Sequence, residues 1–222
     1  MGIAIGLDVY GTLVDPLGMA VQLREFVGDS ADELAAHWRA KQLEYTVRRT
    51  AMGAYENFDV CTAQALRFVL SNAQISLMSE EQQRLVDQYQ TLEAYPDAIA
   101  GLRDLKEKGF ALVAFSNGVG ATLRRLLDHA GLMPLLEGII SVDELKTFKP
   151  DPRVYAYLAD CLKRPKHETW LISSNSFDVI GAKSAGLKAA WIRRNPSATF
   201  DSWGVEPDLI SRDLMELAAN LR

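Results

Sequence analysis

The second half of the sequence alternates between short apolar segments and segments with helical periodicity. The apolar segments predict strands at 110–115, 138–142, 169–173, 188–192 and 208–210, and the periodic segments predict helices at 98–108, 120–130, 153–161, 178–185 and 213–220. Three of these helices are followed by a glycine, a residue at which helices commonly end. Strands that alternate with helices at this spacing are typical of parallel sheets. The predicted fold class is therefore α/β, with a doubly wound, Rossmann-like parallel sheet.

A long helical block separates the first strand from this pattern. An apolar run at 3–7 predicts a buried strand, whereas residues 15–95 carry helical patterns and no strand signal. A capping-box pattern at 30–33 opens a predicted helix that continues past Tyr45, and further helices are predicted at 58–71 and 79–90. On the first of these helices Leu34, Trp38 and Tyr45 share one face, and we predict that this face packs in the hydrophobic core. We therefore predict a Rossmann-like core formed by residues 1–14 and 96–222, with an inserted all-helical segment, here called the cap, formed by residues 15–95.

Composition excludes several classes of function. A length of 222 residues is sufficient for a full hydrophobic core. The net charge is −5 and no run of Lys or Arg stands out, so no nucleic-acid partner is expected. Cys61 and Cys161 are too few for a disulfide framework, and the three scattered histidines form no metal-ligand pattern. Since neither a signal-peptide pattern nor a membrane-length apolar run is present, we expect a cytoplasmic protein with no membrane partner and no cofactor.

Polar side chains follow several of the predicted strands, at the points where those strands end. Asp8 follows the first strand, and Lys149 precedes a helix that Pro152 is suited to open. The other strand-end groups are Ser116 with Asn117, and Ser173 with Asn175 and Asp178. Each group alone fits ordinary turn or capping chemistry. Because the carboxyl ends of parallel strands share one edge of a sheet, their convergence favours an anion-handling site built around a carboxylate.

A cation is required among these groups. The carboxylates of Asp8 and Asp178 would repel each other in a closed pocket unless a positive charge lay between them. Lys149 can supply that charge and hold Asp8 ionised as a nucleophile, while Thr12 can hydrogen-bond the carboxylate or the turn that follows it.

These motifs resemble those of the haloacid dehalogenase superfamily, and within it the L-2-haloacid dehalogenases. The matching segments are Asp-Val-Tyr-Gly-Thr at 8–12, the cap segment 38–46, Ser-Asn-Gly at 116–118, Lys-Pro-Asp-Pro at 149–152 and Ser-Ser-Asn at 173–175. The resemblance covers nearly the whole chain. It implies metal-independent hydrolysis of short L-2-haloalkanoic acids to D-2-hydroxy acids, with inversion, through an aspartyl ester. It also implies a homodimer whose other partners are only substrate and water.

The resemblance also implies roles for individual residues. Asp8 is the expected nucleophile, and Arg39 in the cap is expected to draw off the halide, with Asn117 and Phe177 completing the halide cradle. Ser116 and the backbone N–H groups of Val9 and Tyr10 are expected to bind the substrate carboxylate. The remaining expected site residues are Leu43 and Phe58 beside the substrate, and Thr12, Lys149, Tyr155, Ser173, Asn175 and Asp178 around the nucleophile. At position 177 some relatives carry Trp, so pocket size there can differ.

The chemistry of the residues separates this activity from phosphate hydrolysis. Superfamily phosphatases place a second acid two residues after the nucleophile, where this sequence has Tyr10. Chloride and bromide leave without a proton, so dehalogenation needs no such acid. Asn175 also stands where those phosphatases carry an acid that helps to hold a divalent cation. A magnesium-dependent phosphatase and a catalytically silent binding protein are the alternatives.

Overall fold

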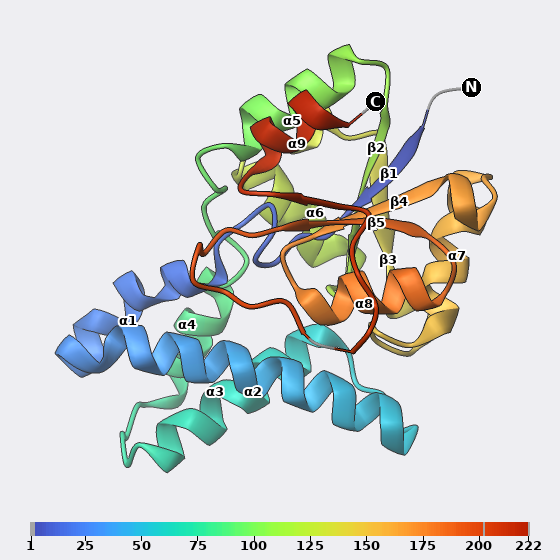
Figure 1. Ribbon diagram of the computed structural model, residues 1–222. Helices are drawn as coiled ribbons and strands as arrows, with labels where there is room; N and C mark the ends of the chain where they lie inside the picture. The colour runs from blue at the N-terminus through green and yellow to red at the C-terminus, as the bar shows by residue number, and fades with distance from the viewer. Residues whose placement is uncertain (1–2, 202, 222) are drawn as a thin grey trace.

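The computed structural model describes residues 3–201 and 203–221, and its centre is a parallel sheet (Figure 1). Within those residues the sheet has six strands in the order β3-β2-β1-β4-β5-β6. The strands are β1 (Ala4–Leu7), β2 (Ala111–Ser116), β3 (Gly138–Ser141), β4 (Thr169–Ser173), β5 (Lys188–Ile192) and β6 (Leu209–Ser211). The chain runs outward from β1 to β3 and then returns to the other side of β1. The order therefore reverses between β1 and β4, the place where open α/β sheets bind ligands.

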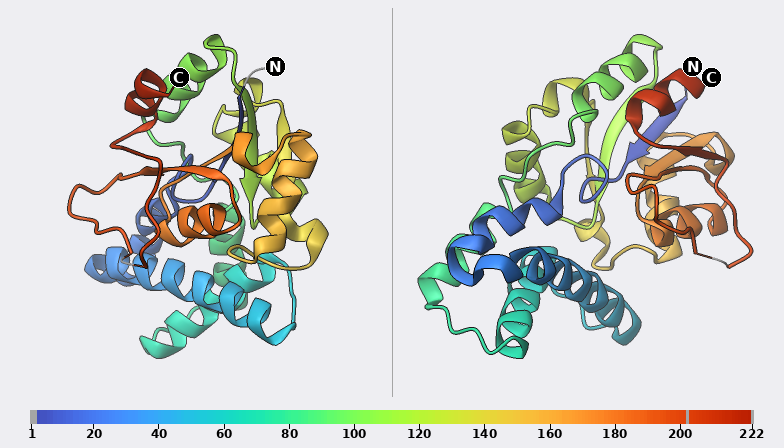
Figure 2. Two further views of the ribbon diagram at one scale, coloured as in Figure 1. Left: turned by 45° about the vertical axis from the view of Figure 1, so that its right-hand side comes forward. Right: turned by 60° about the vertical axis from the view of Figure 1, so that its left-hand side comes forward.

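Helices cover both faces of the sheet (Figure 2). They are α5 (Ala98–Glu107), α6 (Gly120–His129), α7 (Pro152–Leu162), α8 (Ser176–Ser184) and α9 (Leu214–Asn220). The buried side chains divide accordingly, because alternate strand residues face opposite sides. Leu112 of β2 belongs to the core on the side of α5, α6 and α9, whereas Val113 packs with α7 and α8. The predicted doubly wound α/β fold is confirmed.

Four helices within the described residues lie between β1 and α5 and gather at one end of the molecule (Figure 1). They are α1 (Met19–Val27), α2 (Ala31–Met52), α3 (Phe58–Asn72) and α4 (Ser79–Gln88). Leu34 and Trp38 on α2 are buried, and Tyr45 is partly buried against the same core. These helices form the predicted all-helical insertion. The boundaries that assign residues 15–95 to a cap domain stay a prediction.

The predicted capping box at the start of α2 is wrong. Ser30 has helical backbone angles (φ −79°, ψ 0°), and its side chain makes no capping hydrogen bond. A 3₁₀ turn over Gly28–Ser30 leads directly into the helix. An N-cap side chain reaches the backbone only from an extended residue, so this turn removes the geometry that the motif requires.

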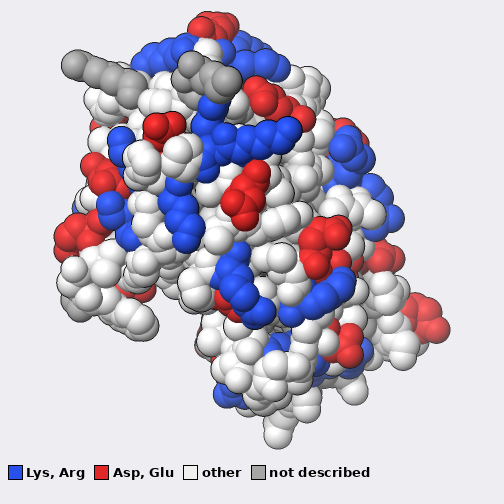
Figure 3. Space-filling view, turned by 90° about the vertical axis from the view of Figure 1, so that its right-hand side faces the viewer, with Lys and Arg blue, Asp and Glu red and all other residues white. Residues whose placement is uncertain are grey.

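Two further observations concern the surface. On the face in Figure 3, Lys and Arg side chains are interspersed with Asp and Glu rather than gathered into one basic patch. Among the described residues, no helix has the length and apolar character needed to cross a bilayer.

Candidate active site

Asp8 lies directly after β1, at the point where the strand order reverses. Its N–H still donates to the Ile172 carbonyl oxygen of β4 at 2.9 Å, so the sheet fixes its backbone. The chain then turns back on itself, with Leu13 N–H donating to Val9 C=O at 2.8 Å. Gly11 makes this turn with φ +90°, a backbone conformation that residues with a Cβ rarely adopt. The turn leaves the Asp8 side chain at the edge of the sheet, only 6% exposed.

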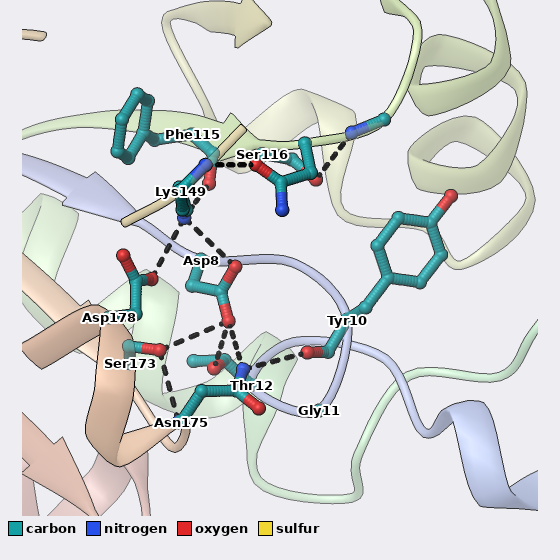
Figure 4. A network of polar contacts seen from close by, with 12 residues as sticks. Asp8, Tyr10, Gly11, Thr12, Phe115, Ser116, Lys149, Ser173, Asn175 and Asp178 are labelled. Atoms are coloured by element: carbon teal, nitrogen blue, oxygen red, sulfur yellow. Dashed lines mark hydrogen bonds and ion pairs between the residues drawn. The ribbon is translucent and has the colours of Figure 1, made fainter. Parts of the chain in front are cut away.

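The two oxygens of the Asp8 carboxylate have different surroundings (Figure 4). Oδ2 accepts three hydrogen bonds, from Thr12 Oγ1 at 3.0 Å, Ser173 Oγ at 3.1 Å and Asn175 Nδ2 at 2.7 Å. Oδ1 accepts one, from Lys149 Nζ at 3.0 Å. A carboxylate oxygen has about two lone-pair positions. The side of Oδ1 is therefore the less crowded side for an incoming group.

Lys149 is the buried cation between the two carboxylates. Besides Asp8, its Nζ donates to Asp178 Oδ2 and to the Phe115 carbonyl oxygen, both at 2.9 Å. These three acceptors use all three ammonium protons. Burial opposes the charged form, but the Asp178 and Asp8 carboxylates outweigh it and raise the pKa of Lys149 above its usual value. The lysine therefore stays charged, as predicted from the need for a positive charge at this position.

Asp178 is held on its other side by Tyr155. The Tyr155 hydroxyl donates to Asp178 Oδ1 at 2.9 Å, and both side chains are fully buried. Burial, the Asp178 charge and this hydrogen bond raise the pKa of Tyr155 well above its usual value, so the hydroxyl remains a donor. Gly181 makes the contact possible, because a Cβ there would lie 2.7 Å from Cε2 of the Tyr155 ring.

The predicted residues after β2 join the same network. Asn117 is buried, and its Oδ1 accepts a hydrogen bond from the Lys149 backbone N–H at 2.9 Å. Ser116 is also buried, and its Oγ accepts from Gly118 N–H at 3.2 Å. This places the end of β2 beside the loop that carries Lys149.

The cap contributes Arg39 to the edge of this site. Arg39 Nη2 donates to the Tyr10 carbonyl oxygen at 3.2 Å, two residues beyond Asp8. Further hydrogen bonds join cap to core, among them those from Thr122 Oγ1 to Asp59 Oδ2 at 2.7 Å and from Phe148 N–H to Thr50 Oγ1 at 3.3 Å. The structure therefore brings Arg39 to the loop that carries Asp8 in a closed arrangement of cap and core.

An aromatic cluster lines the cap side of the same loop. The Tyr10 ring packs against Phe58 and Tyr89, with ring centroids 5.1 and 5.6 Å apart, and Figure 4 shows it directed away from Asp8. Burial raises the pKa of Tyr10 well above its usual value, so its hydroxyl stays neutral. Leu43, one turn after Arg39 on α2, is partly buried.

Phe177 is the predicted site residue that lies outside this network. It is partly buried in the first turn of α8 and lines a cavity of about 470 Å³ together with Pro150 and Trp203. Its assignment to the halide cradle stays a prediction.

Sequence reasoning missed three residues that support the site. Gln42 accepts a hydrogen bond from Arg39 and Tyr89 donates one to Gln42, while Ser174 N–H donates to Thr12 Oγ1 at 2.9 Å. The spacing of Gln42 three residues after Arg39 on a predicted helix is a usable signal, because such pairs share a face. No local pattern marks Tyr89, which lies on a different segment of the cap.

The residues present do not fit a divalent cation. Among residues 3–201 and 203–221, no group of three or more His, Cys, Asp or Glu side chains is arranged to hold a metal ion. The position between Asp8 and Asp178 is taken by Lys149 Nζ, at 3.0 and 2.9 Å. A hard cation such as Mg²⁺ requires a cluster of oxygen ligands with negative charge, and here a lysine neutralises the carboxylates instead.

A family model and two similar proteins of known activity place this chain in the same family. The family model for haloacid dehalogenase-like hydrolases matches residues 4–186. (S)-2-haloacid dehalogenase 1 of Pseudomonas sp. (strain CBS-3) is 40% identical over 84% of this chain and 82% of its own length. The (S)-2-haloacid dehalogenase of Pseudomonas fluorescens is 36% identical, covering 95% of this chain and 92% of that protein.

A solved structure agrees with these sequence matches. The L-2-haloacid dehalogenase from Xanthobacter autotrophicus with chloropropionic acid covalently bound superposes with a TM-score of 0.91 and 29% identity, covering 99% of this chain and 98% of that one. The fold, the arrangement around Asp8 and these relatives lead to one conclusion: the chain belongs to the L-2-haloacid dehalogenases of the haloacid dehalogenase-like hydrolase family.

Proposed function

We propose that this enzyme hydrolyses the carbon–halogen bond of short L-2-haloalkanoic acids and releases D-2-hydroxy acids. The observation that carries the proposal is the buried Asp8–Lys149–Asp178 arrangement, in which a lysine lies between two carboxylates and neutralises their charge. Tyr10 stands where a phosphatase needs a second acid, and its ring is directed away from Asp8. Such a site suits a leaving group that departs without a proton.

In the first step, Asp8 Oδ1 attacks the α-carbon from the side opposite the halogen. The new C–O bond forms as the carbon–halogen bond breaks, and the halide leaves with the bonding electron pair, which inverts the carbon. Ser116 and the N–H groups of Val9 and Tyr10 hold the substrate carboxylate beside Asp8, so the reacting atoms are already aligned. Arg39, with Asn117 and Phe177, stabilises the charge that grows on the halide.

In the second step, water attacks the carbonyl carbon of the Asp8 ester. The carbonyl oxygen is then Oδ2, which already accepts hydrogen bonds from Thr12, Ser173 and Asn175. These three donors are positioned to stabilise the negative charge that develops on that oxygen. Asn175 and Asp178 orient the water. When the acyl C–O bond breaks, one proton of the water stays with the departing hydroxy acid, another is released, and Asp8 returns as a carboxylate.

The proposed activity is tested by halide release from separate L and D enantiomers of 2-chloropropionate, with and without EDTA. Chloride is expected from the L enantiomer alone, at a rate that EDTA does not change, because no step uses a divalent cation. Activity that is lost on chelation and restored by magnesium contradicts this mechanism. Phosphate release from phosphate esters without any chloride release favours the phosphatase instead.

The enzyme is also proposed to be a cytoplasmic homodimer, as the resemblance to its family implies. Val47, Met52 and Phe68 on α2 and α3 are 48, 70 and 41% exposed, so the cap has exposed apolar side chains available for contact with a second copy. Sedimentation velocity is expected to give about twice the chain mass of 24.6 kDa. A single monomeric species at micromolar concentration contradicts the dimer.

A further inference from the structure

Gln42 is a fully buried polar side chain in contact with Arg39. Its exposed fraction is 0%, and its Oε1 accepts a hydrogen bond from Arg39 Nη1 at 2.7 Å. The same oxygen accepts from the Tyr89 hydroxyl at 3.0 Å, and Gln42 Nε2 donates to Thr62 Oγ1 at 2.5 Å. The Gln42 amide therefore joins α2 to α3 and to the segment after α4, beside the Arg39 side chain.

The donors and acceptors around Gln42 allow one orientation of its amide. Arg39 has only donors, so it must face the amide oxygen. Burial raises the pKa of Tyr89, so its hydroxyl keeps its proton and donates to the same oxygen. Thr62 Oγ1 gives its own proton to the Phe58 carbonyl oxygen at 2.8 Å and can only accept from Gln42. Rotation of the amide would break all of these pairings at a buried position, where unpaired polar groups are costly.

Gln42 fixes Arg39 without neutralising it. Arg39 is held at two of its nitrogens, by Gln42 and by the Tyr10 carbonyl oxygen, and both acceptors are neutral. Within the described residues no carboxylate forms an ion pair with Arg39. A guanidinium has five N–H groups, so others remain for an anion. A glutamate at position 42 would hold the side chain equally well but would cancel much of the charge that an anion feels.

We propose that Gln42 is the positioning residue for Arg39: it aims the guanidinium at the departing halide while leaving its positive charge uncompensated. The inference rests on the proposed dehalogenase function, in which Arg39 contacts the halide. Gln42 is fully buried, and its amide pairs with Arg39, Tyr89 and Thr62, so we expect it to act through Arg39 and not on the substrate directly. Its replacement should therefore change kcat and halide affinity through Arg39, and should have no effect of its own once Arg39 is absent.

Two substitutions separate positioning from charge. Gln42→Met removes the acceptor and leaves Arg39 charged, so kcat for L-2-chloropropionate is expected to fall about tenfold. Gln42→Glu keeps an acceptor of the same length but adds a negative charge, so kcat is expected to fall on the order of a hundredfold. The inhibition constant for bromide, measured at constant ionic strength, should rise in both variants and more in Gln42→Glu. KM should change less than kcat.

A double-mutant cycle with Arg39→Ala gives the decisive comparison. Arg39→Ala alone is expected to lower kcat on the order of a hundredfold, because charge stabilisation in a dry site is lost. If Gln42 acts through Arg39, adding Gln42→Met to Arg39→Ala should lower kcat no further. If Gln42 merely supported the fold, the losses of kcat from the two single substitutions would instead multiply in the double variant. Should Gln42→Met fail to melt cooperatively, Gln42→Leu, which also lacks the acceptor, carries the same cycle.

The cap contains a second, partly buried arginine–glutamine hydrogen bond, which serves as a matched control. Arg49 Nη2 donates to Gln64 Oε1 at 2.8 Å, and both line a cavity that includes none of the site residues named above, so Gln64→Met should leave kcat and bromide inhibition unchanged. The inference is overturned by folded Gln42 variants with the kcat and bromide inhibition of the parent, or by losses that multiply in the cycle. A parent enzyme that releases no halide contradicts the proposed function, which is a separate result.

Discussion

Lys149→Met is expected to lower kcat on the order of a thousandfold and to destabilise the folded enzyme. The substitution removes the charge that holds Asp8 ready as a nucleophile and leaves two buried carboxylates without their shared partner. Removing one partner of a buried ion pair costs about 3–5 kcal/mol of unfolding free energy. For a chain of this length that loss lowers Tm by roughly 10 °C. Thermal unfolding and steady-state kinetics measure the two effects.

The destabilisation of Lys149→Met should depend on pH in a defined direction. Burial raises the pKa of Asp178, Lys149 lowers it and the charge of Asp8 raises it. The resulting pKa of Asp178 lies above its usual value. Without Lys149 the folded-state pKa of Asp178 moves further above its unfolded value of about 3.9. Such a group contributes its full stability below the unfolded pKa and loses it as pH rises through the folded pKa. The Tm deficit of the variant should therefore shrink as the pH is lowered toward the unfolded pKa of Asp178.

Lys183→Met is the matched control for this substitution. Lys183 pairs with Asp208 at 2.7 Å, but the two side chains are 25 and 31% exposed, and such pairs contribute little stability. This variant should keep the kcat of the parent, with a Tm within about 2 °C. A folded Lys149→Met enzyme with kcat within tenfold of the parent would show that Lys149 does not prepare the nucleophile.

The sequence was sufficient to predict which groups meet at the edge of the sheet. Asp8, Lys149 and Ser173 each adjoin a strand or helix end, and parallel strands deliver such ends to one edge. The structure brings them together, at 3.0 Å between Lys149 and Asp8 and 3.1 Å between Ser173 and Asp8. The resemblance of the motifs to a known family supplied the chemistry of the substrate, which sheet topology alone does not specify.

Local sequence patterns could not predict how the segments of the cap pack against one another. Gln42 and Tyr89 meet across 47 positions of sequence, and neither carries a motif that predicts the contact. The capping-box pattern at Ser30 failed for a related reason, since a preceding 3₁₀ turn overrides the local preference. Phe177 lines a cavity together with Pro150 and Trp203, and its place in the halide cradle stays a prediction.

The two possible routes to the product differ in the origin of its hydroxyl oxygen. In the ester route, Asp8 Oδ1 becomes the hydroxyl oxygen of the first product molecule, and solvent oxygen enters at the carbonyl carbon of Asp8. In the competing route, Asp8 acts as a general base and water attacks the α-carbon directly, so the first product carries solvent oxygen. The surroundings of Asp8 favour the ester, because Lys149 donates to the attacking oxygen and three donors hold the oxygen that does not attack.

A single turnover in H₂¹⁸O, with enzyme in excess over L-2-chloropropionate, distinguishes the two routes. The peptide that contains Asp8 and the released 2-hydroxy acid are then examined by mass spectrometry. We expect a gain of roughly two mass units on the Asp8 peptide and an unlabelled hydroxyl oxygen in the product, as nucleophilic catalysis requires. An unlabelled Asp8 peptide together with a labelled product would contradict the ester route and make Asp8 a general base.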